Sequence, residues 1–341
     1  MDLHILTRGT YVHVKDEMFE IRVPSGDKAN PFIPRHFAAK KVRAIHIPKS
    51  AALSSDAVFL ALQFHIDILF IDYNGQPQGR VWHSRLGSTT RIRKAQLETA
   101  AKPLGLQWVQ SWVGEKILRQ CEWLRRMRKS RESLHGDFDL ATQRMEALQK
   151  QIMALKGLTS EVADTLRAWE GSSGRAYFQI LARAIPKKHR FEGRSMRPAR
   201  DAFNAFLNYG YGMLYGKVEK ALMIAGLDPY VGFLHRDDYN QTSMVFDFIE
   251  PYRPWVDEAV FKLFSGKKVR DDHTLPIANG LSLGAEGKPL VVEAINLAFD
   301  QERIRYRGRN LTRHHALQLD AHRFANSLID RTETPIQEVT L

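Results

Sequence analysis

The residues best suited to chemistry fall within residues 226–254 of the 341-residue chain. His235 precedes Asp247 by 12 positions and Glu250 by 15 positions. Because Asp247 and Glu250 are three residues apart, they share a face on a helical turn. An imidazole beside two carboxylates suits a divalent metal ion that acts on phosphate. One more carboxylate upstream would complete such a site, and Glu170 is our candidate.

Each of these residues also has an ordinary structural explanation. A single glutamate on a helix, such as Glu170, is usually a surface charge. A histidine that follows apolar residues, such as His235, is often a satisfied core residue. Their spacing matches no standard metal-binding motif of the zinc-finger kind. The pattern alone therefore leaves a metal site and a purely structural role both open.

The chain is basic, which favours a polyanionic partner. Its formal net charge is +12 and its pI is about 9.7, so its affinity for a nucleic acid would fall with salt. The loop 186–200 is rich in lysine and arginine, and contact with DNA is one interpretation of it. A solvated loop on a generally basic surface explains the same composition.

A helical period begins near residue 96 and combines aromatic with basic residues. The apolar and the basic positions alternate: Trp108, Trp112, Leu118 and Trp123 against Lys116, Arg119, Arg125, Arg126 and Arg128. Such interleaving suits nucleic-acid contact. A helix with one apolar stripe and a solvated basic face explains it equally well, and we favour that interpretation.

The N-terminal residues 1–85 have the pattern of a β-rich domain. Alternating or continuous apolar runs predict strands over residues 3–6, 11–14, 19–23, 42–47 and 66–73. Ser54 or Ser55 is suited to cap a short helix that ends near residue 62. The spacing of the histidines in this region fits no metal-ligand pattern, so we expect none of them to bind a metal. They are His4, His13, His36, His46, His65 and His83.

The rest of the chain is predicted to be helical. Helices are expected over residues 140–155, 159–185, 201–225, 255–264, 289–299 and 312–330, with an irregular segment at 265–288. The fold class is therefore α+β, with a small N-terminal β-rich domain followed by a larger all-α C-terminal catalytic domain. The expected boundaries are 1–85 for the β-rich domain, 86–98 for a linker, 99–330 for the catalytic domain and 331–341 for a frayed tail.

Two glycines and two serines interrupt the helix predicted over residues 159–185. Each glycine costs about 1 kcal/mol relative to alanine in a helix interior, so their presence calls for a reason. The four residues directly follow Glu170. They would allow a ligand or another backbone to come close, and a tight helix crossing is the ordinary alternative.

The composition also bears on the compartment. Cys121 is the single cysteine, so no internal disulfide forms, and a reducing cytoplasm is the expected location. We take Cys121 as a buried small residue. The N-terminus has no signal-peptide pattern. The most apolar run, residues 57–71, contains Gln63, His65 and Asp67 and is too short and polar to cross a bilayer.

Three ordered blocks carry a resemblance to a known family. They are residues 170–178, residues 197–211 and residues 226–254. Together they resemble the CRISPR-associated adaptation integrase, the universal large subunit of the spacer-acquisition complex, over residues 160–265. Two departures stand out: Ala199 replaces a second proline, and residues 236–240 replace a glycine-bearing turn after His235.

The resemblance implies a site and a reaction. Glu170, His235 and Glu250 would bind Mg²⁺ or Mn²⁺, with Asp247 close by. The 3′-hydroxyl of an incoming DNA end would attack a phosphodiester of the CRISPR array by in-line transesterification. His235 is either a ligand or a base that orients or deprotonates the nucleophile.

The resemblance also implies partners. It suggests a homodimer formed through the β domains, bridged by a small ferredoxin-like subunit, acting on double-stranded and branched DNA. For DNA contacts we nominate Arg194, Arg197, Arg200 and Arg253. Two alternatives remain: a hydrolytic nuclease on branched DNA that uses the same metal site with water as the nucleophile, and a DNA-binding scaffold without turnover.

Overall fold

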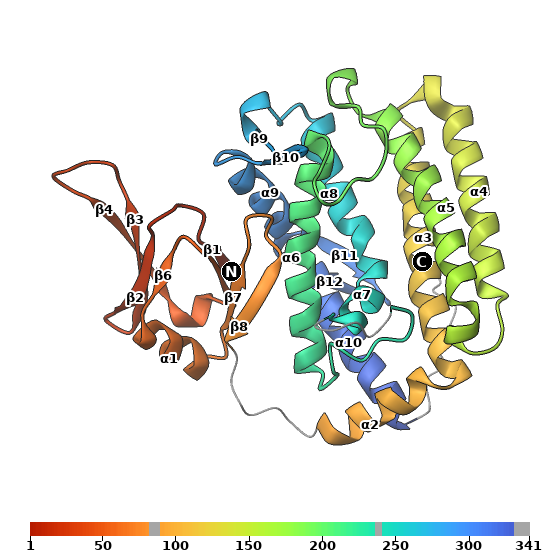
Figure 1. Cartoon of the computed structure of the whole chain (residues 1–341), viewed down its shortest axis with the longest axis horizontal. Helices are drawn as coiled ribbons and strands as arrows, with labels where there is room; N and C mark the ends of the chain where they lie inside the picture. The colour runs from red at the N-terminus through yellow and green to blue at the C-terminus, as the bar shows by residue number, and fades with distance from the viewer. Residues whose placement is uncertain (82–88, 236–240, 331–341) are drawn as a thin grey trace.

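The computed structural model describes residues 1–81, 89–235 and 241–330. The N-terminal strands form two four-stranded sheets on one side of the molecule, and the long helices fill the other side (Figure 1). The predicted fold class, with a strand-rich N-terminal part and a larger helical C-terminal part, is confirmed. No helix within the described ranges is long and apolar enough to span a membrane.

The first sheet has the order β1-β5-β7-β8 and the second has the order β4-β3-β2-β6. Their strands are β1 (Asp2–His4), β2 (Tyr11–Lys15), β3 (Met18–Pro24), β4 (Phe32–Ala38), β5 (Ala44–Pro48), β6 (Ala52–Leu53), β7 (Asp67–Ile71) and β8 (Pro77–Val81). The structure confirms the predicted strand segments. Their apolar side chains, such as Phe19 and Ile21, fill one core. Helix α1 (Ser55–Gln63) packs beside that core, and Ser54 caps it by accepting a hydrogen bond from the amide of Ala57.

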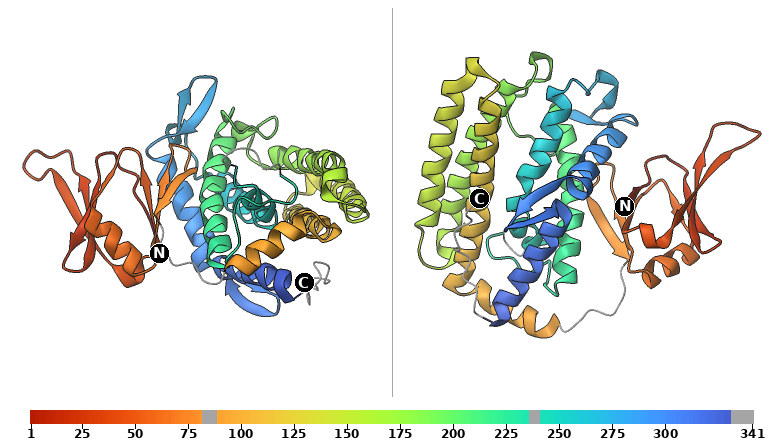
Figure 2. Two further views of the ribbon diagram at one scale, coloured as in Figure 1. Left: turned by 60° about the horizontal axis from the view of Figure 1, so that its bottom comes forward. Right: turned by 180° about the vertical axis from the view of Figure 1, so that it is seen from behind.

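Nine helices build the C-terminal part in the described residues. They are α2 (Thr89–Ala100), α3 (Pro103–Arg128), α4 (His135–Met153), α5 (Thr159–Ala184), α6 (Ala202–Ile224), α7 (Ser243–Phe248), α8 (Arg253–Ser265), α9 (Gly287–Asn296) and α10 (Arg313–Asp330). Short helical turns accompany them: η1 (Ala39–Lys41) in the N-terminal part, then η2 (Glu132–Leu134), η3 (Lys187–His189), η4 (Glu250–Tyr252), η5 (Asp271–His273) and η6 (Leu297–Gln301). Helices α3, α4 and α5 lie side by side in every view (Figure 2).

Two details of the sequence prediction are wrong. The C-terminal part is not all-α, because it carries the hairpins β9 (Thr274–Ile277) with β10 (Gly280–Leu283) and β11 (Arg303–Tyr306) with β12 (Arg309–Thr312). In addition, most of the expected linker 86–98 is helical, because α2 begins at Thr89. The expected frayed tail 331–341 lies outside the described residues.

Helix α6 lies between the N-terminal sheets and helices α3, α4 and α5 (Figure 1). It packs closely on the turn after β7: a side chain at Gly212 would come within 2.7 Å of the carbonyl oxygen of Gly75. Only glycine permits this approach. One helix therefore touches the β-rich part with one face, and it holds residues near the candidate site, such as Tyr215, with another.

Candidate metal centre

Glu250 lies in η4, directly after α7, and its side chain is 10% exposed. Its Oε2 accepts a hydrogen bond from Nζ of Lys116 at 2.5 Å, and its Oε1 accepts one from Nε of Arg253 at 2.7 Å. Burial alone would raise the pKa of this carboxyl, but the charges of Arg253 and Lys116 outweigh burial and hold the pKa at about 2. Glu250 is therefore ionised at neutral pH.

Glu170 is joined to Glu250 by the same lysine. Lys116, on α3, also donates a hydrogen bond to Oε1 of Glu170, on α5. The lysine side chain is 6% exposed, whereas that of Glu170 is 34% exposed. Burial lowers the pKa of Lys116, but the two carboxylates more than offset that effect and raise it. Two predicted metal ligands, 80 residues apart in sequence, thus share one cationic group.

His235 is held by Asp247, which is fully buried. The Asp247 carboxylate accepts hydrogen bonds from three successive amides, those of Phe233 at 2.5 Å, Leu234 at 2.9 Å and His235 at 3.2 Å. It also accepts one from Nδ1 of His235 at 2.6 Å, which assigns the Nδ1–H tautomer to the neutral ring. Nε2 is then the ring nitrogen left for a ligand. Asp247 positions His235, and its oxygens are already engaged.

A glycine makes room for this arrangement. A side chain at Gly232 would come within 2.5 Å of Cβ of Ser243 and 3.1 Å of Oδ2 of Asp247. Any larger residue would push the loop away from α7, where Ser243 and Asp247 lie. The glycine of the third block therefore has a steric role next to the carboxylate that orients His235.

One hydrogen bond connects the histidine loop to the helix of Glu170. Nη1 of Arg167, three residues before Glu170 on α5, donates to the carbonyl of Leu234 at 3.1 Å. Helices α3 and α5, the loop before α7, and η4 therefore converge on one region. Within the described residues, however, the donor atoms of Glu170, His235 and Glu250 do not form a group that lies within 4.8 Å.

The donor set suits a divalent cation. Two ionised carboxylates already face one cationic atom, Nζ of Lys116, and an imidazole with a fixed Nδ1–H presents its other nitrogen. Hard cations prefer carboxylate oxygens and accept an imidazole. Glu170, Glu250 and His235 are the residues that would hold Mg²⁺ or Mn²⁺.

The family to which the chain belongs follows from its similarity to known proteins. The model of the family described as "CRISPR associated protein Cas1" matches residues 3–296. The chain belongs to the Cas1 family. A relative from Archaeoglobus fulgidus, named a CRISPR-associated endonuclease Cas1, is 31% identical over 292 residues, which covers 81% of this chain and 83% of the relative.

Two solved structures share the Cas1 fold. One is a casposase bound to its integration product, with a TM-score of 0.81 and 21% identity over 97% of this chain and 91% of that one. The other is a Cas6-RT-Cas1–Cas2 complex, with a TM-score of 0.78 and 19% identity over 99% of this chain and 36% of that one. At these identities the likeness concerns the fold.

The four arginines nominated for DNA contact differ in this Cas1-family chain. Arg253 is bonded to Glu250 and to the hydroxyl of Tyr215 at 3.1 Å, and it stacks on Tyr211 at 4.8 Å. Arg194 also lies over Tyr211 and donates to Asn204, a side chain of α6, at 2.9 Å. Both arginines therefore already have partners within the chain.

Arg197 and Arg200 are exposed in the basic loop. Neither side chain has a hydrogen bond or an ion pair with any residue that the structure describes. They are therefore the nominated arginines whose guanidinium groups are available to a phosphate backbone.

The predicted close approach at the α5 glycines is only partly explained. No atom lies within 4 Å of the position that a side chain at Gly174 would take, and at Gly171 the nearest is a guanidinium nitrogen of Arg175 at 3.8 Å. No neighbouring helix is therefore in close contact with these two glycines, whereas Ser173 between them is buried. The surface of α5 beside Glu170 is open, which leaves room for a ligand.

Lys116 is the residue that sequence reasoning missed. We assigned it to a solvated basic face, yet it is buried between two carboxylates. The signal was present: Lys116 follows the apolar Trp112 by four residues and precedes Trp123 by seven, so it falls on the buried stripe of its helix. A lysine on that stripe implies a buried anionic partner.

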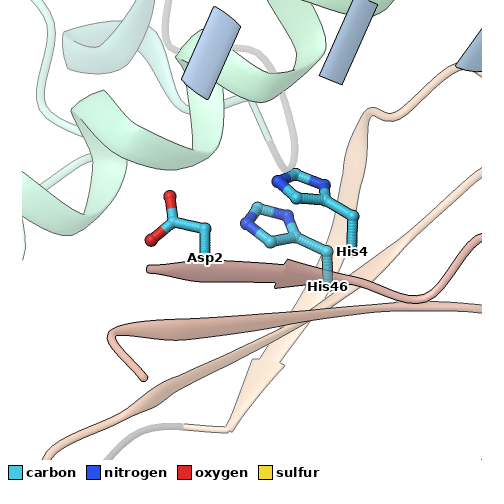
Figure 3. Close-up of side chains that lie close together, drawn as sticks. All are labelled: Asp2, His4 and His46. Atoms are coloured by element: carbon cyan, nitrogen blue, oxygen red, sulfur yellow. The ribbon is translucent and has the colours of Figure 1, made fainter. Parts of the chain in front are cut away.

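A second cluster of candidate ligands lies at the edge of the N-terminal sheet (Figure 3). Asp2, His4 and His46 form the one group of three such donors within 4.8 Å among the described residues. His4 and His46 are paired across β1 and β5, and their rings stack at 4.0 Å. The sequence pattern did not indicate that these two histidines lie close to Asp2.

The single carboxylate of this cluster already has two cationic partners. Asp2 accepts a hydrogen bond from Lys217 of α6 at 2.5 Å and forms an ion pair with Arg43 at 3.3 Å. Arg43 also pairs with Asp300 of η6 at 2.5 Å. The carboxylate is thus already neutralised by two cations, and the cluster serves as an ion-paired junction between the two parts of the chain.

Proposed function

We propose that the chain is a divalent-metal-dependent DNA integrase that inserts new spacers into a CRISPR array. The proposal rests mainly on the pair of carboxylates, Glu170 and Glu250, held on one cationic atom. His235, whose ring is oriented by Asp247, lies on a loop that is hydrogen-bonded to the helix of Glu170. Membership of the Cas1 family, with curated relatives named endonucleases, supports the same reaction class. The fold shared with a casposase bound to its integration product agrees with joining of strands.

The proposed reaction exchanges one phosphodiester for another. The 3′-hydroxyl of an incoming DNA end forms the new P–O bond while the old P–O bond breaks in line. When bound, Mg²⁺ or Mn²⁺ would neutralise the phosphodiester oxygens and the charge on the leaving oxygen.

The residues of the chain have separate parts in that reaction. Glu170, Glu250 and Nε2 of His235 hold the ion, or His235 takes up the proton of the attacking hydroxyl. Asp247 fixes the ring, and Arg253 fixes one oxygen of Glu250.

We further propose three partners: a second copy of the chain, a small protein subunit and DNA. The exposed strand β4 lies at the edge of its sheet and carries Phe32 and Ile33, which are 46% and 51% exposed. It is a suitable surface for the homodimer. The second protein is a small ferredoxin-like subunit, in line with the fold shared with a Cas1–Cas2 complex. DNA binding in the cytoplasm through Arg197 and Arg200 completes the proposal.

The test is a strand-joining assay with a labelled protospacer and a plasmid that carries the repeat, with Mg²⁺ or Mn²⁺. Glu250→Gln and His235→Ala should each lower joining by more than about 100-fold, since losing even an outer partner of a metal ligand costs about 10–100-fold. Glu258→Gln is the matched control, because Glu258 pairs with Arg126 and Lys262 and not with Lys116.

The same assay separates the alternatives. Undiminished joining by Glu250→Gln refutes the site. Nicks without joined strands would indicate a hydrolytic nuclease, and salt-dependent binding without metal-dependent products would indicate a scaffold.

A further inference from the structure

Lys116 lies between the two carboxylates that are proposed as metal ligands. Its ammonium donates to Oε1 of Glu170 and to Oε2 of Glu250. Within the described part of the chain, its ammonium has no other hydrogen-bond acceptor and no other ion pair. These two oxygens are therefore the hydrogen-bond acceptors that stabilise the buried ammonium, and the ammonium offsets the repulsion between the two carboxylates.

Arg253, the other cation at Glu250, is fixed from several sides. Besides Oε1 of Glu250, its guanidinium is bonded to the hydroxyl of Tyr215 and stacks on Tyr211. A planar, multiply bonded arginine is a permanent partner, whereas a lysine is a compact charge on a flexible stem. The oxygens whose cationic partner can be replaced are therefore those that accept hydrogen bonds from Lys116.

The charges at the centre balance without a metal. Glu170 and Glu250 contribute two negative charges, and Lys116 and Arg253 contribute two positive charges. Adding a divalent cation while the ammonium stays would place two cationic groups on the same oxygen pair in a buried setting, where their repulsion is strong. Removing the lysine without a metal would leave the carboxylates facing each other.

We propose that Lys116 and the divalent cation are alternative occupants of one oxygen pair, Oε1 of Glu170 and Oε2 of Glu250. This inference rests on the proposed function, because it takes that pair as the metal site. The lysine holds the two carboxylates together before the metal binds, and it is displaced when the metal arrives. It therefore weakens metal binding and stabilises the fold without metal.

The test compares Mn²⁺ binding by the full chain after treatment with EDTA, measured by electron paramagnetic resonance of free Mn²⁺. Lys116→Met should bind Mn²⁺ at least about 10-fold more tightly than the wild type, because no charge then competes for the oxygens. Its melting temperature should fall without Mn²⁺ and rise with saturating Mn²⁺ by more than that of the wild type.

Lys217→Met is the matched control. Lys217 is also a buried lysine paired with a carboxylate, that of Asp2, but it lies at the domain junction. This variant should lose stability while its Mn²⁺ affinity stays that of the wild type. If Lys116→Met does not fold, Lys116→Gln replaces it, with the same expected direction.

Two outcomes overturn the proposal. An unchanged or weaker Mn²⁺ affinity of the Lys116 variant, while the wild type binds Mn²⁺ and Glu250→Gln does not, defeats the competition alone. If neither the wild type nor the Lys116 variant binds Mn²⁺ in a way that Glu250→Gln abolishes, the metal site itself is wrong, and the proposed function with it.

Discussion

The candidate centre and the domain junction each bury a lysine against carboxylate, yet they have opposite surroundings. At the junction, Asp2 is shared by Lys217 and Arg43, and the neighbouring imidazoles stack on each other. At the candidate centre, Glu170 remains one-third exposed and His235 keeps one ring nitrogen free of Asp247. The two buried ion pairs thus differ in the exposure of their carboxylates: Glu170 is partly open to solvent, whereas Asp2 is enclosed.

The largest expected effect breaks the junction. Asp2→Asn leaves the buried Lys217 without its carboxylate partner, whereas Arg43 keeps Asp300, and removing one partner of a buried pair costs about 3–5 kcal/mol. Urea denaturation should show this loss in the free energy of unfolding. Strand joining by the folded protein should stay that of the wild type. A loss below about 1 kcal/mol would show that the junction is not held by this pair.

The next effect depends on pH. Burial lowers the pKa of His46 to about 4, against a usual value of 6.5. Between these values the unfolded chain binds a proton that the folded chain excludes, so stability falls as the pH drops from 6.5 towards 4. The full contribution is roughly 3 kcal/mol at 1.36 kcal/mol per pKa unit.

His46→Gln isolates that contribution. Burial also raises the pKa of Asp67, on the neighbouring strand, to about 6, which gives the opposite pH dependence. Both forms of the protein keep Asp67, so the difference between their stability curves reports on His46 and on its effect on the stacked His4, whose pKa is lowered by burial and by His46. Parallel curves from pH 6.5 to 4 would show that His46 is not a buried neutral group.

A smaller effect is expected at the candidate centre from Asp247→Asn. The amide keeps the shape but accepts fewer hydrogen bonds from the loop and from Nδ1 of His235. Strand joining should fall about 10–100-fold, as for other outer partners of metal ligands. Thr242 lies at the start of the same helix, and Thr242→Ser serves as the control. Full activity of the Asp247 variant would place His235 outside the reaction.

The smallest effect concerns the basic loop. Arg197→Ala should weaken DNA binding almost equally across sequences and reduce the salt slope by about 1, as expected for a phosphate contact. Arg194→Ala should instead lower stability, because Arg194 bonds to Asn204 and lies over Tyr211. The DNA affinity of both variants, measured as a function of salt concentration, tests the first prediction, and the free energy of unfolding tests the second. An unchanged slope for Arg197→Ala removes it from the interface.

The sequence predicted most of the long elements, because apolar periodicity reports on them directly. The four residues proposed for chemistry came from the ordered motifs that carry the family resemblance, and their roles stay predictions. The sequence did not predict the hairpin of β9 and β10, since β9 is largely exposed and has no buried face to produce a pattern. Helix α2 was missed because its buried residues are polar: Gln96 is fully buried and bonds to the backbone at Asp228 and Val231.

The partners at the centre were harder to predict than its ligands. That Lys116 joins Glu170 to Glu250 depends on how α3, α5 and η4 cross, and no local pattern encodes that crossing. The charge pattern of one helix suggested a solvated lysine because arginines surround it in sequence. Its position on the apolar stripe was the contrary signal.

The close seating of α6 on Gly75 has a mechanical consequence. Tyr211, the neighbour of Gly212, bonds to the buried Asp257 at 2.5 Å and lies against Arg253, which grips Glu250. The helix thus works as a stiff lever between the β-rich part and the carboxylate. Under the proposed pairing of two copies through β4, a displacement of the β-rich part would therefore have a packed path to Glu250 along this helix.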